Sequence, residues 1–215
     1  MKIYWVRHAE TDFNRQGIVQ GSKIDSLLNE LGQQQAHALF KHYSKLPFTK
    51  FYTSALQRTQ QTLKGWKKLG HDLNAWPELN EISWGDIEGH VNTLETRQQF
   101  HTVVKAWTSG DFEAHLPNAE SAQAAWARVA PFIQHLESLK DETVLVCSHG
   151  RLLRIVFGEL LGGGLHTMEN FPSDNTGVSL THYSPETGWV ADTLNCTKHL
   201  SVHGLEPFYA QYYPT

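Results

Sequence analysis

Short apolar runs of strand character alternate with helical stretches along this chain, and this alternation constrains its fold more than any other feature. The clearest run covers 143–147 and leads into a helical pattern at 152–161, which the glycines at 162–164 end. Alternating strands and helices favour a parallel sheet, because parallel neighbours need a crossover connection. We therefore predict an α/β fold, a three-layer sandwich with a mainly parallel central sheet and helices on both faces.

The expected strands cover 3–6, 50–53, 73–76, 143–147, 177–183 and 189–194. The expected helices cover 31–43, 55–69, 92–107, 121–139 and 152–161, and Gly65 interrupts the second of them. No internal repeat, low-complexity tract or linker divides the chain. We therefore expect one domain over 1–215, in which the polar segment 90–120 is a candidate cap over the site.

The composition narrows the function classes. A formal net charge of -4 argues against nucleic-acid binding, which normally uses a basic stripe, but a few arginines can still attract a small anion. Cys147 and Cys196 fit no metal-ligand spacing and suit a reducing cytosol. The apolar run before Arg7 is too short for a signal peptide, and no stretch is long enough to span a membrane. We expect a soluble, cytoplasmic protein without nucleic-acid or membrane partners; the oligomeric state stays open.

Two of the expected strands run directly into a histidine. Val6 leads to Arg7 and His8, and Cys147 leads through Ser148 to His149. Ligands of such sheets bind beyond the carboxyl ends of the strands, so both histidines are expected at one edge. An imidazole nitrogen can attack phosphorus when the other ring nitrogen is held, and a guanidinium grips phosphate through parallel hydrogen bonds. This pattern indicates phosphoryl chemistry.

Five motifs, in order along the chain, resemble those of the histidine phosphatase superfamily (phosphoglycerate mutase-like, branch 1). Residues 7–11 with Asn14 are similar to the Arg-His-Gly-Glu-Thr-x-x-Asn signature. The next motif, Gln-Gly-x-x-Asp-x-Pro-Leu, is similar to Gln20-Gly21 with Asp25 and Leu28. Residues 53–62 resemble the Thr-Ser-x-Leu-x-Arg segment, residues 79–89 the Leu-x-Glu-x-x-x-Gly-x-x-Glu-Gly stretch, and residues 148–150 the second catalytic histidine. The resemblance runs from residue 3 to about 180.

Three departures from the family pattern are visible. Ala9 stands where glycine is commoner, and Ser26-Leu27 where a proline often precedes the leucine. Residues 118–121, Asn-Ala-Glu-Ser, replace a frequent Gly-Gly-Glu-Ser run that helps to shape the pocket. Substrate preference therefore cannot be carried over from that segment.

The resemblance implies a mechanism. His8 would attack phosphorus and become a phosphohistidine, while Glu81 would protonate the leaving oxygen and later deprotonate water. The phosphoryl oxygens would be surrounded by Arg7, Arg58 and His149, which would stabilise the charge of the transition state. The implied phosphate-binding residues are Arg7, Asn14, Gln20, Gly21, Arg58 and His149, with no metal and no cofactor. Glu10 is expected to orient His8 or to pair with a cation.

The expected activity is hydrolysis of a small phosphorylated metabolite, such as a sugar phosphate, α-ribazole phosphate or a phosphoglycerate. The nearest alternative is a phosphoglycerate mutase; mutases tend to carry longer insertions that exclude water, whereas about 60 positions separate Gly89 from His149 here. A non-catalytic phosphate-binding module is less consistent with five catalytic residue types that are all present. Metal-dependent hydrolysis through His8, Glu10 and His149 lacks a ligand motif.

Overall fold

A six-stranded sheet forms the centre of the protein, with the strand order β3-β2-β4-β1-β5-β6. The computed structural model describes residues 1–91, 93–140 and 142–205. The strands are β1 (Lys2–Arg7), β2 (Lys50–Thr53), β3 (Asn74–Ala75), β4 (Thr143–Ser148), β5 (Val178–Ser184) and β6 (Gly188–Cys196). The first four run parallel, and β5 and β6 pair antiparallel at one side.

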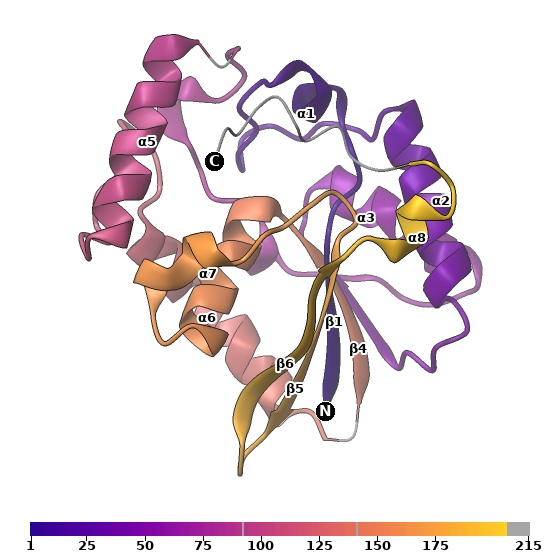
Figure 1. Cartoon of the computed structure of the whole chain (residues 1–215). Coiled ribbons are helices and arrows are strands. Elements are labelled where there is room, and N and C mark those ends of the chain that lie inside the picture. The colour runs from indigo at the N-terminus through magenta and orange to yellow at the C-terminus, as the bar shows by residue number, and fades with distance from the viewer. Residues whose placement is uncertain (92, 141, 206–215) are drawn as a thin grey trace.

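Helices α6 (Ala122–Ser138) and α7 (Gly150–Leu161) cover one face of this sheet (Figure 1). The strand side chains buried against them are Ile3, Trp5, Tyr52, Val144 and Val146. Within β1 and β4 these residues are two apart, because successive side chains of a strand point to opposite faces. The apolar stripe of α6 supplies Ala125, Val129, Phe132, Ile133 and Leu136 to the same core.

Helices α2 (Glu30–Tyr43), α3 (Gln57–Thr62) and α4 (Lys64–Lys68) cover the opposite face (Figure 1). The intervening strand residues, Val6, Phe51, Leu145 and Cys147, pack there against Leu39, Leu63 and Trp66. Both faces are therefore buried, which confirms the predicted three-layer sandwich with a mainly parallel sheet.

Several expected elements differ in detail. The helix predicted over 55–69 is two helices, α3 and α4, joined at Leu63. A Cβ on Gly65 would lie 2.5 Å from the Phe40 ring, so the missing side chain lets α4 approach α2. The strand predicted over 73–76 pairs only at Asn74–Ala75. The helix predicted over 92–107 is α5 (Leu94–Thr108), and position 92 lies outside the described residues.

Short elements were missing from the prediction, because a few residues carry too weak a periodic signal. They are the helices α1 (Asp12–Gln16) and α8 (Lys198–Ser201) and three 3₁₀ turns at Pro77–Leu79, Gly85–Ile87 and Leu165–Asn170. Among the described residues, no helix is long and apolar enough to cross a bilayer.

The register of β1 against β4 fixes where the chain leaves the sheet. Arg7 of β1 lies opposite Ser148 of β4, and both strands end at this level. The N–H of His8 donates to the Ser148 carbonyl at 2.9 Å. His8 and His149 are consequently neighbours just beyond the carboxyl edge of the sheet.

Replacing Phe132 by alanine is expected to lower the free energy of unfolding by about 3–5 kcal/mol, measured by urea denaturation. Its side chain is fully buried, and its ring packs edge-on against Tyr52 with the centroids 5.3 Å apart. Leu94→Ala is the control, because Leu94 is 74% exposed and should cost less than about 0.5 kcal/mol. Equal losses in the two variants would contradict the packing described for this face.

Candidate active site

His8 lies directly after β1 and is 2% exposed. Its ring Nδ1 lies 2.8 Å from the carbonyl oxygen of Ala9. Because a carbonyl oxygen only accepts, Nδ1 of the neutral ring carries the proton and Nε2 keeps a lone pair. The side chain of Asn175 holds the backbone at the same place, donating from Nδ2 to the His8 carbonyl at 2.8 Å.

His149 precedes the first residue of α7 and is fully buried. Its ring lies beside that of His8, with the centroids 5.2 Å apart. Nδ1 of His149 lies 3.2 Å from Nε of Arg58, and Nε2 lies 2.8 Å from Oγ of Ser54. The two histidines predicted at one edge of the sheet therefore lie side by side there, with Arg58 and Ser54 next to them.

Arg58 belongs to α3 and is also fully buried. Nη1 donates to the carbonyl of Ile24 at 2.6 Å, and Nη2 donates to the carbonyl of Gly21 at 3.3 Å. Together with the Nε contact to His149, three of the five N–H groups of this guanidinium have described partners. The remaining two N–H groups can serve an anion.

The loop that contains Gly21 approaches the segment after Glu81 very closely. A Cβ on Gly21 would lie 2.8 Å from the carbonyl oxygen of Ile82 and 2.4 Å from Oε1 of Glu88. Glu88 fastens this contact, since its carboxylate accepts from the N–H of Lys23 and of Trp84, each at 2.9 Å. Gly21 therefore contributes through its backbone, as the acceptor that orients Arg58.

Arg7, the last residue of β1, lies against the start of α7. Its Nη1 donates to the carbonyl of Ser173 at 2.8 Å. A Cβ on Gly150 would lie 3.2 Å from Arg7 Nε, so a glycine here allows the guanidinium to lie flat against the helix start. The Arg7 carbonyl accepts from the N–H of Thr176 at 3.0 Å.

The carboxylate of Glu81 lies at the N-terminus of α7. Oε2 accepts from the N–H of Arg151 at 3.1 Å, and Oε1 accepts from the N–H groups of Leu152 and Ile82, both at 3.0 Å. His149, the residue before the helix, makes no side-chain capping bond. A carboxylate from a distant loop thus satisfies the amides that a helix start leaves without partners, where the helix dipole also favours negative charge.

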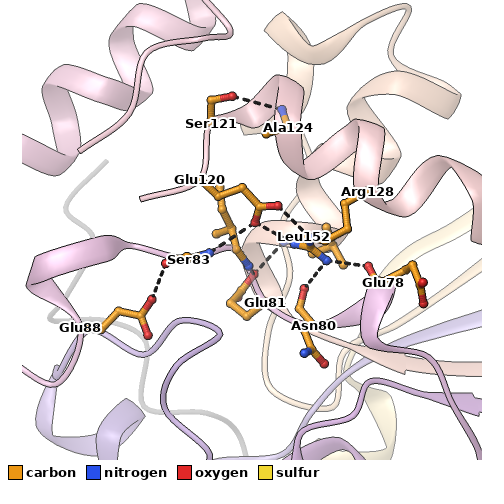
Figure 2. A network of polar contacts seen from close by, with 11 residues as sticks. Glu78, Asn80, Glu81, Ser83, Glu88, Glu120, Ser121, Ala124, Arg128 and Leu152 are labelled. Atoms are coloured by element: carbon orange, nitrogen blue, oxygen red, sulfur yellow. Dashed lines mark hydrogen bonds and ion pairs between the residues drawn. The ribbon is translucent and has the colours of Figure 1, made fainter. Parts of the chain in front are cut away.

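A second layer of polar contacts holds the backbone around Glu81 (Figure 2). Arg128 of α6 forms a two-pronged ion pair with Glu120, at 2.7 Å from Nε and 2.8 Å from Nη2. Its Nη1 donates to the carbonyls of Glu78 and Asn80, just before Glu81, at 2.7 and 3.1 Å. Residues 118–121, whose sequence differs from the family pattern, therefore have a structural role. Glu120 positions Arg128, and Arg128 fixes the loop before Glu81.

Asn14 and Gln20, both predicted to bind phosphate, face Thr11. Oδ1 of Asn14 accepts from the Thr11 N–H at 3.2 Å and lies 3.4 Å from Asn175 Nδ2. Oε1 of Gln20 accepts from the hydroxyls of Thr11 and Ser26. Asn14 reaches the cluster through Asn175, whereas the hydrogen bonds of Gln20 hold the loop around Thr11.

Burial and positive charge keep both histidines neutral. Burial lowers the pKa of His8 well below its usual range, and the neighbouring Arg58 and Arg7 lower it further. The pKa of His149 is depressed in the same way, first by burial and then by Arg58, His8, Arg7 and Arg128. Burial also lowers the pKa of Arg58 to about 10, which leaves it charged at neutral pH.

The described partner of Glu10, which was expected to orient His8 or to pair with a cation, is an amide. Its carboxylate accepts from Asn29 Nδ2 at 2.9 Å, and the Ala9 carbonyl takes the place of an orienting group for His8. Sequence reasoning also missed Ser54, Thr62, Arg128 and Asn175, whose hydrogen bonds hold the cluster. Ser54 and Thr62 stand inside the motif at 53–62, which was the available signal.

The arrangement provides an unprotonated nitrogen, a fixed carboxylate and two guanidinium groups in one buried cluster. These are the groups that an acid–base reaction on a phosphate ester requires. In the part of the chain that the structure describes, no group of three His, Cys, Asp or Glu side chains is arranged to hold a metal ion.

Comparison with known proteins gives consistent matches. The family model of the histidine phosphatase superfamily (branch 1) matches residues 3–197. The chain is 32% identical to a protein of Hydrogenobacter thermophilus provisionally named phosphoserine phosphatase 2, over 86% of this chain and 91% of the relative. It is also 32% identical to the 2,3-bisphosphoglycerate-dependent phosphoglycerate mutase of Bartonella henselae, over 84% and 97% of the two chains.

A solved structure shares the fold. The α-ribazole phosphatase of Shigella flexneri superposes with a TM-score of 0.78 at 27% sequence identity, covering 91% of this chain and 96% of that chain. The similar proteins therefore include some that are named phosphatases and one that is named a mutase.

A third buried histidine predicts acid sensitivity. His199 is 1% exposed, and its Nε2 lies 3.0 Å from the hydroxyl of Thr176. Burial lowers the pKa of His199 to about 4, and the charges of His42 and His203 contribute to this shift. In the unfolded chain this histidine takes up a proton at about pH 6.5, whereas in the folded protein it does so only at a pH of about 4. The free energy of unfolding should therefore fall as the pH drops between these two values.

The variant His199→Leu should flatten this fall by up to about 1.4 kcal/mol per pH unit, measured by urea denaturation at several pH values. His37→Gln, at an exposed position of α2, is the control and should leave the slope unchanged. An unaltered slope in His199→Leu would show that folding does not lower the pKa of this histidine.

Proposed function

The chain belongs to the histidine phosphatase superfamily (branch 1), and we propose that it is a metal-independent phosphomonoesterase. It acts through a phosphohistidine on a small phosphorylated metabolite. The observation that carries this proposal is the ring of His8, whose Nδ1 faces the Ala9 carbonyl at 2.8 Å and so leaves Nε2 unprotonated. The lowered pKa of His8 keeps that nitrogen available as a nucleophile at neutral pH.

In the proposed first step, Nε2 of His8 attacks phosphorus in line with the ester oxygen, a bond forms between nitrogen and phosphorus, and the phosphorus–oxygen bond breaks. Arg7 and Arg58 bind the phosphoryl oxygens and stabilise the charge that develops on them. The two N–H groups of Arg58 without a described protein partner suit this task. Loss of one such donor typically costs about 3 kcal/mol of activation free energy.

Glu81 is proposed to handle the protons. Its carboxyl group gives a proton to the leaving oxygen, and the resulting carboxylate removes a proton from the water that attacks the phosphohistidine. The three N–H groups at the carboxylate fix its position for both steps. His149 completes the phosphate site, and Asn14, Gln20 and Gly21 support it.

Neither a metal ion nor a cofactor is part of this proposal, because Arg7 and Arg58 supply the positive charge. A metabolite-sized substrate is consistent with the names of the relatives, which include phosphoserine phosphatase, α-ribazole phosphatase and phosphoglycerate mutase. We propose a single domain over 1–215 in a cytoplasmic protein. Segment 90–120, with α5 packed through Trp107 on the core, is the proposed cap.

Hydrolysis of para-nitrophenyl phosphate with a chelator present tests the chemistry. The wild type should release phosphate, and His8→Ala should be slower by at least about a thousandfold, because the nucleophile is gone. His37→Ala, an exposed histidine on α2, serves as the matched control and should keep wild-type activity. Equal rates for wild type and His8→Ala would show that His8 is not the nucleophile.

The mutase remains the second candidate, on the strength of the 32% identical mutase relative. Phosphate release and isomerisation of 3-phosphoglycerate should therefore be measured on one preparation. The proposal requires release of phosphate from a metabolite panel to exceed isomerisation; efficient isomerisation without release would make the chain a mutase.

A further inference from the structure

Thr176 holds a backbone conformation that its own side chain disfavours. It lies in the loop between the 3₁₀ turn Leu165–Asn170 and β5, and its φ is 55°, in the left-handed region. A β-branched residue is an outlier there, whereas glycine adopts such a φ without steric cost. Thr176 is also fully buried. Contacts with the surrounding residues must therefore hold it in this strained turn.

The turn at Thr176 places two neighbouring donors on the backbone of the catalytic motif. The N–H of Thr176 donates to the carbonyl of Arg7 at 3.0 Å, and Nδ2 of Asn175 donates to the carbonyl of His8 at 2.8 Å. On the other side, the N–H of His8 donates to the carbonyl of Ser148 at 2.9 Å. The peptide groups around the nucleophile are thus fixed partly by β4 and partly by this strained loop.

The hydroxyl of Thr176 contacts a residue near the C-terminal end of the described chain. Its Oγ1 lies 3.0 Å from Nε2 of His199 in α8, and the ring of His199 is 1% exposed. Helix α8 lies against α2 (Figure 1), where the His199 ring packs 5.8 Å from the ring of Tyr43 and 6.3 Å from that of His42. The described chain offers no hydrogen-bond partner to Nδ1 of His199, so the contact to Thr176 is the one that orients this ring.

The strain at position 176 has a physical use. A glycine would relieve it, but a residue without a side chain leaves the left-handed region as easily as it enters it. Asn175 would then move together with the turn. The threonine hydroxyl ties the turn to a packed helix instead, and strain held by surrounding contacts is typical of sites whose geometry has to be fixed.

We propose that Thr176 is a positioning residue for the nucleophile, because its hydroxyl, tied to His199, holds the turn that fixes the backbone of Arg7 and His8. The inference rests on the proposed function, since it concerns catalysis only if His8 attacks phosphorus. That attack requires Nε2 of His8 in line with the ester oxygen, and a misplacement of about 1 Å can cost about a hundredfold in rate. Thr176 touches no reacting atom and acts through the main chain.

Three substitutions at position 176 separate the hydroxyl from the turn. Thr176→Ser keeps the hydroxyl, and its kcat with para-nitrophenyl phosphate should stay within about threefold of the wild type. Thr176→Val keeps the shape and Thr176→Gly adopts the turn easily, but both lose the hydroxyl, so kcat should fall about tenfold to a hundredfold. KM should change less than kcat, because Arg58 and His149 are unaltered. Wild-type activity in Thr176→Gly would overturn the proposal, since any residue that makes the turn would then suffice.

Thr181→Val is the matched control. Thr181 is 1% exposed, its Oγ1 accepts from Nε1 of Trp5 at 2.9 Å, and it lies opposite Ile3, well before the end of β1. This variant also removes a buried hydroxyl, so urea denaturation should show a loss of stability, whereas kcat should stay at the wild-type value. An equal fall of kcat in Thr181→Val and Thr176→Val would contradict a positioning role, because loss of stability alone would then explain both.

Substitutions of His199 test the same contact from its other side, even if a variant of Thr176 fails to fold. His199→Leu should lower kcat as much as Thr176→Val does. The double variant should be no slower than either single one, because both changes remove one interaction. His199→Gln, whose amide can reach the hydroxyl, should restore most of the activity. Losses that multiply in the double variant would show that the two residues act independently, against the proposal.

Hydrogen exchange measures the tie without turnover. In His199→Leu the backbone N–H of Thr176 should exchange at least about tenfold faster than in the wild type, because the turn opens more often. Unchanged exchange would overturn the inference. Faster exchange in a protein that hydrolyses no ester would support the tie and overturn only the proposed function. Hydrolysis with an unchanged kcat in both Thr176→Val and His199→Leu would overturn only the inference.

Discussion

The hydrogen bond from the His8 N–H to the Ser148 carbonyl joins the ends of the two central strands, and the rest of the site depends on it. It continues the register in which Arg7 lies opposite Ser148, so that the chain leaves both strands at the same level. The residues at this edge are buried, and the loops that contain Gly21, Glu81 and Asn175 pack around them. The imidazole rings of His8 and His149 become neighbours as a result.

Burial of the charged groups of the site is tolerated because they have partners from other parts of the chain. Arg58 uses the carbonyls of Gly21 and Ile24, and Glu81 uses the amides at the start of α7. Such hydrogen bonds offset the cost of removing charge from water. They also leave little freedom of orientation, which is the condition for stabilising a transition state by fixed charges and dipoles.

The layers and the two histidines at the sheet edge could be predicted from the sequence, and so could the strands near 3–6, 50–53 and 143–147. Apolar runs of strand length and the points where they end are local signals. The family motifs added Arg58 and Glu81. The contact of His149 with Ser54 and the contacts of Arg128 with the carbonyls of Glu78 and Asn80 could not be predicted, since they join segments far apart in sequence through specific side-chain geometry.

The central claim is that Nε2 of His8 becomes covalently phosphorylated. Rapid acid-free quenching of the full chain during turnover, followed by peptide mass spectrometry and phosphorus NMR, measures this directly. The account predicts a phosphoryl group on Nε2 of His8, because Nδ1 is turned to the Ala9 carbonyl. A phosphoryl group on another residue, or turnover without any phosphoenzyme when the step that consumes it is slowed in Glu81→Gln, would contradict it.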